Sequence, residues 1–214
     1  MDEEITIINS ETRNEKIKNF FLKNQKKIIL SIIVLILLIL SFYSYQIFKN
    51  KQKIQISEKY NSAIIEYENV KNTKTILTMK EIIEDKDSTY SPLALYFLLD
   101  NKLIDNRDEV NNLFDILINK TSLEYEIKNL VIYKKGLFNA DLAEESELLA
   151  ILDPVVKSES VWRSHGLYLL AEYFYFKNEK QKSKEFFEKI ISTQNANQDI
   201  ILEAQKRLTR DLSE

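Results

Sequence analysis

An uninterrupted apolar run constrains this chain more than any other feature. The 21 residues from Ile28 to Phe48 contain no charged side chain. Because an α-helix rises about 1.5 Å per residue, roughly 20 apolar residues cross a hydrocarbon core about 30 Å thick. A buried helix of a soluble protein is normally shorter or carries a polar stripe, which this run lacks. The run therefore predicts a membrane-spanning helix.

A removable export signal fits this run less well. Such a signal has an apolar region of roughly 7–15 residues followed by small residues. Here the run is longer and continues as Ser-Phe-Tyr-Ser-Tyr-Gln. Aromatic residues, which gather at membrane interfaces, stand before the run at Phe20 and Phe21 and close it at Tyr43, Tyr45 and Phe48. We expect the helix to be retained as an anchor in the lipid bilayer.

The basic residues predict how the span is oriented. Residues 1–27 hold six Lys and Arg, and the stretch 49–59 holds four. Positive residues tend to stay in the cytoplasm, whereas long C-terminal domains cross largely regardless of charge. We therefore expect a cytoplasmic tail with a juxtamembrane helix at 1–27, a transmembrane helix at 28–48 and an exported domain at 49–214. In a bacterium this is a single-pass inner (plasma) membrane protein with a periplasmic domain.

Charge and composition exclude several classes of function. The chain has 30 Lys and Arg against 33 Asp and Glu, and the tail holds six of the former and five of the latter, so the remainder has a net charge near −4. This argues against nucleic acid, which needs a basic face. The absence of cysteine excludes disulfides, thiolate nucleophiles and zinc–sulfur sites. The single histidine, His165, cannot form a histidine-based metal site alone.

Glycine is also scarce, and its scarcity predicts an all-α fold. Gly136 and Gly166 are the two glycines, and they cannot supply a phosphate-binding loop or a strained nucleophile turn. Apolar spacing near 3.6 residues predicts helices throughout the domain, joined by short polar connections. The predicted helices span 52–70, 73–85, 91–103, 107–120, 123–138, 144–156, 160–177, 180–193 and 197–212.

These helices recur with a period. Taking Ile82, Ile116 and Ile151 as markers, the steps are 34 and 35 residues, and the step to Lys189 is 38. A helix–turn–helix repeat of about 34 residues is the tetratricopeptide period. Each helix pair is too small to bury its own apolar face, so stacking on the next pair favours a solenoid.

The last unit, "HGLYLLAEYFYFKNEKQKSKEFFEKIIS", resembles a tetratricopeptide repeat. Leu170-Ala171 stand at the family's Leu-Gly pair and Phe174 at its tyrosine. Asn178 stands at the position of the turn glycine. Asparagine is compatible with this position because it also enters the left-handed conformation. Ser183 replaces the small alanine that lets helices approach. The resemblance implies a tetratricopeptide-like helical-hairpin solenoid.

The whole layout resembles the YfgM-like group, bacterial single-span proteins with a periplasmic tetratricopeptide-like domain. The resemblance rests on "ETRNEKIKNFFLKNQKKIIL" before the span and on "DIILEAQKRLTRDL" at the other end. It implies an ancillary subunit of the Sec translocon that works with periplasmic chaperones on exported client chains. From the motifs that the sequence lacks, we expect no cofactor, no small-molecule substrate and no enzymatic activity.

One helical stripe is the candidate binding site. Trp162, His165, Tyr168, Glu172 and Tyr175 follow one another at steps of three or four residues, so they share a helix face. In the tetratricopeptide family, the positions of His165, Tyr168, Glu172 and Tyr175 face the concave groove. The resemblance thus implies a protein-binding groove with aromatic anchors. The alternative is that these rings pack in the core or lie under the final helix.

The sequence leaves three functions open. The first is a binding scaffold tethered to the membrane, with no catalytic or metal-binding residues. The second is a scaffold for envelope assembly or cell division. The third is a membrane-anchored enzyme or sensor, which the missing nucleophile turns, phosphate loops and multi-histidine sites disfavour.

Overall fold

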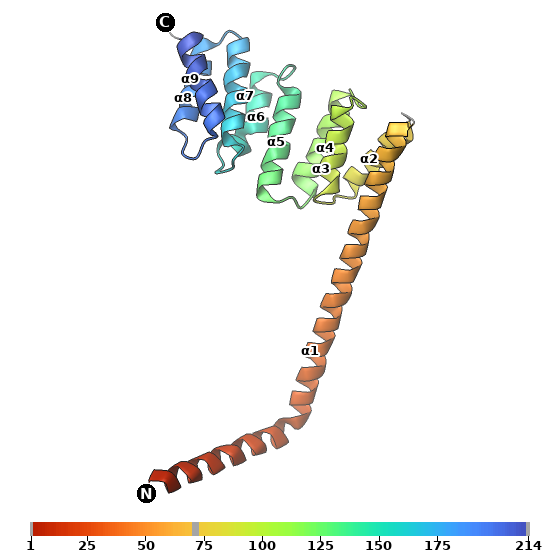
Figure 1. Ribbon diagram of the computed structural model, residues 1–214, viewed down its shortest axis with the longest axis vertical. Helices are drawn as coiled ribbons and strands as arrows, with labels where there is room; N and C mark the ends of the chain where they lie inside the picture. The colour runs from red at the N-terminus through yellow and green to blue at the C-terminus, as the bar shows by residue number, and fades with distance from the viewer. Residues whose placement is uncertain (1, 70–72, 213–214) are drawn as a thin grey trace. The chain divides into compact units, whose positions relative to one another are not determined.

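The chain folds into helices alone over the residues that the structure describes, 2–69 and 73–212. Figure 1 shows this computed structural model. Within those residues there are nine helices and no strand, which confirms the all-α prediction. Their bounds are α1 Asp2–Asn69, α2 Thr73–Glu84, α3 Tyr90–Asp100, α4 Arg107–Lys120, α5 Tyr125–Asn139, α6 Glu145–Val156, α7 Arg163–Phe176, α8 Lys180–Ser192 and α9 Gln198–Arg210.

Helix α1 contains the predicted span and is far longer than expected. It continues without a break to Asn69, so residues 52–69 are helical as predicted but form the end of α1 and not a separate helix, and residue 70 lies outside the described residues. No glycine or proline occurs before Pro92, so neither of the two residue types that most strongly disfavour a helix occurs in α1. The terminal turns of α1 pack on the following helices, where the Tyr60 and Tyr90 rings lie 5.6 Å apart.

The apolar side chains of α1 are uncovered along the span. Leu35, Leu37 and Leu38 are each about 60% exposed, and every residue from 29 to 48 is exposed. Helices of water-soluble proteins cover such side chains against a core. In the described part of the chain, α1 is the one helix long and apolar enough to cross a membrane, as the sequence predicts.

The chain divides into two compact units between Gln55 and Ile56. In the second unit, α2 to α9 form a row in which each helix packs on its neighbours in the chain (Figure 1). Contacts also join α2 to α4, α5 to α7 and α7 to α9. Three buried apolar clusters follow one another along this row. The core is therefore built from local pairs rather than around one centre.

Two helices end in the same hydrogen-bonded turn. Asn178 closes α7 with φ of 62°, the left-handed conformation that the sequence predicts for it. The Glu179 amide donates to the Phe174 carbonyl at 2.8 Å, which is the Schellman pattern. Lys102 closes α3 in the same way with φ of 52°, so α3 ends at Asp100 and not at the predicted residue 103.

A buried amide ties α4, α5 and α6 together. Asn139 is fully buried and donates to the Asn111 side-chain oxygen at 2.8 Å. Its own oxygen accepts from Arg107 Nε at 2.9 Å, and Arg107 also contacts Glu147 at 2.8 Å. Because a buried polar group without partners is costly, this network fixes the order of the three helices.

Candidate functional site

The four residues of the predicted groove lie on α7 and are half-buried, but they meet two different neighbours. His165 lies toward α5, with its ring 5.0 Å from Trp162 and 5.8 Å from Tyr133. Tyr133 in turn stacks on Trp162 at 5.8 Å with an angle of 19° between the rings. The Nδ1 atom of His165 is buried without a hydrogen-bond partner. His165 therefore belongs to an aromatic cluster at the contact of α5 with α7.

The other three residues lie beside the last helix, α9. Arg207 of α9 donates to both carboxylate oxygens of Glu172, at 2.7 and 2.9 Å. Its guanidinium lies 4.2 Å from the centre of the Tyr175 ring, and Tyr168 packs edge-on against Phe187 at 5.6 Å. Burial, together with the Glu172 carboxylate, raises the pKa of Tyr168 to about 12. These contacts correspond to packing against the final helix, the alternative that the sequence left open for the stripe.

Replacing Arg207 with methionine tests how firmly α9 is held to α7. Arg207 is 11% exposed and also pairs with Asp211. Its loss removes a bidentate ion pair with Glu172 and a cation–π contact with Tyr175. Because the Glu172 side chain is 36% exposed, solvent screens the ion pair and reduces its contribution to stability. We expect the free energy of unfolding to fall by about 1–2 kcal/mol in chemical denaturation of the full chain in detergent.

Arg210→Met is the matched control, because Arg210 lies on the same helix with its side chain 67% exposed. We expect a smaller effect on the free energy of unfolding than for Arg207→Met.

A hydrogen bond from Arg210 and the charge of Arg207 lower the pKa of Asp211 to about 2. The ionised carboxylate therefore stabilises the fold above its ordinary pKa of 3.8, and this contribution is lost as the pH falls toward 2. Equal effects of the two variants at neutral pH would refute the assigned role of Arg207.

One open cleft lies next to this stripe, and we call it the Phe176 cleft. It has a volume of about 540 Å³. Phe176 is 90% exposed, although a side chain of this size is normally covered. The lining includes two predicted site residues, Glu172 and Tyr175. Its residues are Ala140, Asp141, Leu169, Glu172, Tyr173, Tyr175, Phe176 and Lys177.

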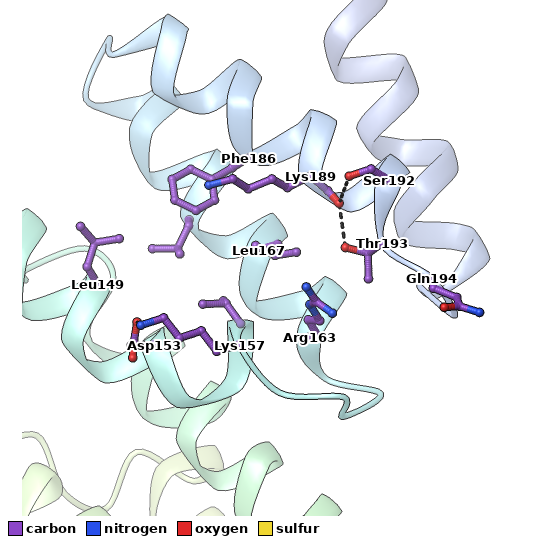
Figure 2. A pocket seen from close by; sticks show the side chains of 12 residues that line it. Leu149, Asp153, Lys157, Arg163, Leu167, Phe186, Lys189, Ser192, Thr193 and Gln194 are labelled. Carbon is purple, nitrogen blue, oxygen red and sulfur yellow. Dashed lines mark hydrogen bonds and ion pairs between the residues drawn. The ribbon is translucent and has the colours of Figure 1, made fainter.

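A second cleft of about 560 Å³ lies where α6, α7 and α8 meet, and we call it the Lys189 cleft (Figure 2). Its apolar wall is formed by Leu149, Val156, Leu167, Leu170 and Phe186. Charged residues come from all three helices, and Figure 2 shows the Lys189 side chain extending over the Phe186 ring, with the ammonium 4.7 Å from its centre. None of the four predicted site residues lines this cleft.

Sequence reasoning missed the Lys189 cleft because its charges are far apart in the chain. Lys157 directly follows α6, Arg163 begins α7 and Lys189 lies in the last turn of α8. No helical period connects them, and they come together only when α6 and α8 pack on α7.

The two clefts are the candidate binding sites of the described surface. Both combine apolar walls with a few fixed charges, which is the usual composition of binding sites. In the part of the chain that the structure describes, no group of three or more His, Asp or Glu residues is placed to hold a metal ion. Comparison with protein-family models, with curated proteins and with solved structures gives no match for this chain.

Proposed function

We propose that the protein is a membrane-anchored scaffold that binds segments of other proteins. The observation that carries this proposal is Phe176, a phenylalanine that is 90% exposed at the edge of an open cleft. Aromatic side chains are frequent energetic anchors at protein interfaces, where a partner covers them. Tyr175 and Leu169 extend the apolar surface beside it.

The helical unit is proposed to be a tetratricopeptide-like solenoid. Support comes from the row of neighbouring helices and from the contacts of α5 with α7 and of α7 with α9. In such a solenoid the first helices of successive pairs lie side by side and line one groove. The left-handed turn at Asn178 joins α7 and α8 as the tetratricopeptide resemblance implies.

The anchor is proposed to be a single-pass span at residues 28–48 of a bacterial inner membrane. The six basic residues before the span support a cytoplasmic tail and, with it, a periplasmic helical unit. The partners implied by the YfgM-like resemblance are Sec translocon subunits, periplasmic chaperones and exported client chains. A tether raises the effective concentration of the domain near membrane-bound partners without any additional contact.

Phe176→Ser tests the proposed binding surface. Because the side chain is exposed, we expect the free energy of unfolding to change by less than about 0.5 kcal/mol. Loss of an interface anchor costs about 2 kcal/mol, so recovery of bound partners should fall by at least about tenfold. The measurement is affinity purification of the full chain in mild detergent, followed by quantification of each co-purified protein.

Leu202→Ser is the control for this experiment, because Leu202 is 54% exposed on α9 and lines neither cleft. It should leave recovery unchanged. Equal recovery with Phe176→Ser and with the unmodified chain would contradict the proposed surface. Recovery of division proteins in place of translocon or chaperone proteins would favour the envelope scaffold.

A further inference from the structure

The Lys189 cleft carries an excess of positive charge in a protein that is acidic as a whole. Its lining contains Lys157, Arg163 and Lys189 but a single carboxylate, Asp153. The complete chain has a net charge of −3. The local charge of this cleft is therefore opposite in sign to the net charge of the chain, and it favours an acidic ligand.

Two of the three cations lack a close carboxylate. Lys157 is paired with Asp153 at 2.7 Å. Lys189, in contrast, forms no ion pair among the described residues, and its ammonium lies over the Phe186 ring. Arg163 has one long contact, 3.7 Å to Glu159, a residue whose side chain is 87% exposed. The Nε atom of Arg163 is buried without any acceptor.

The wall between these cations is apolar, and this limits what can occupy the cleft. An inorganic anion would contact the cations but leave Leu149, Val156 and Phe186 uncovered. A ligand with an apolar group and negative charges on either side of it satisfies both features. The volume of about 560 Å³ falls within the range of about 300–1,000 Å³ that is usual for ligand sites.

We propose that the Lys189 cleft binds an acidic–apolar segment of a partner polypeptide. An apolar side chain packs on the wall between α6 and α8, and flanking carboxylates pair with Lys189 and Arg163. This rests on the proposed function, because it assigns one class of partner segment to a scaffold. It adds a second binding surface, separate in its residues from the Phe176 cleft, so the two can be tested independently.

The test is peptide binding by the full chain in nanodiscs of phosphatidylcholine, a lipid without net charge. The probe is a fluorescent hexapeptide, Asp-Leu-Asp-Phe-Asp-Leu, and the comparison peptide has lysine at each aspartate. We expect binding of the acidic peptide alone, measured by fluorescence anisotropy. Affinity should fall as salt is raised from about 50 mM to about 300 mM, because the pairs are partly exposed.

Charge reversal at one position identifies the site. Lys189→Glu should weaken binding of the acidic peptide by about tenfold, because it removes an attraction and adds a repulsion. Lys180→Glu is the matched control, since Lys180 is exposed on the same helix and does not line the cleft. It makes the same change in net charge and should alter the affinity by less than about twofold.

Three outcomes would overturn the assignment. The first is equal binding of the acidic and the lysine-containing peptides. The second is an equal effect of Lys189→Glu and Lys180→Glu on the affinity for the acidic peptide. The third is a Lys189→Glu effect that is seen only in binding to phosphatidylglycerol vesicles, because the occupant of the cleft would then be a membrane. Each leaves the scaffold function standing if Phe176→Ser still abolishes partner recovery. Conversely, Phe176→Ser could leave partner recovery unchanged while the acidic peptide still binds. This result would contradict the proposed interface at Phe176 but not the peptide site in the Lys189 cleft.

Discussion

Phe187→Ala is expected to lower the free energy of unfolding of the helical unit by about 3–5 kcal/mol. Phe187 is fully buried in the cluster where α7, α8 and α9 meet. Its ring contacts Tyr168 at 5.6 Å, and the Arg207 guanidinium lies 5.9 Å from its centre. Alanine would remove these contacts and leave a cavity that the surrounding helices cannot fill completely.

The measurement is chemical denaturation of the full chain in detergent, with loss of helix monitored by far-UV circular dichroism. Phe176→Ala provides the control, since it makes the same substitution at a side chain that is 90% exposed. We expect the control to change stability by less than about 0.5 kcal/mol. If the two variants were equally stable, Phe187 would not hold the last three helices together.

Arginines at Leu37 and Leu38 are expected to prevent stable insertion of α1 into a membrane. Both residues lie at the middle of the predicted span and are about 60% exposed. An arginine at the centre of a spanning helix costs about 2.5–3.5 kcal/mol in insertion, and two add approximately. Most of the double variant should therefore appear in the soluble fraction after alkaline carbonate extraction of membranes.

The control is the double alanine variant at Leu37 and Leu38, which shortens the side chains without adding charge. It should remain in the membrane fraction with the unmodified chain. Retention of the arginine variant in the membrane would show that the helical unit, and not α1, holds the protein there. Release of the unmodified chain by carbonate would contradict a spanning anchor.

The helices themselves could be predicted because local rules decide them. The prediction of 107–120 agrees with α4, where Asn106 accepts a hydrogen bond from the Glu109 amide and thereby caps the helix. The early end of α3 was missed, because a lysine at position 102 adopts the left-handed conformation that usually requires glycine. The spacing of apolar residues could not reveal this, since Leu103 continues the period beyond the turn.

The candidate site was harder to predict, for a reason that lies in tertiary packing. A helix face can be read from spacing, and the four predicted residues do share α7. What covers that face depends on where α9 packs, and Arg207 is 35 residues beyond Glu172 in the chain. The sequence likewise does not predict that Phe176 is exposed, because a phenylalanine in an apolar stretch is normally expected to be buried.

The central claim is that one apolar helix holds a protein-binding helical unit at a membrane. Photocrosslinking in intact membranes tests it most directly, with a photoreactive phenylalanine analogue in place of Phe176 and, for comparison, in place of Lys180. We expect discrete protein adducts at position 176 that are lost when arginines replace Leu37 and Leu38. Adducts of equal yield at both positions, or adducts that persist without the anchor, would contradict this claim.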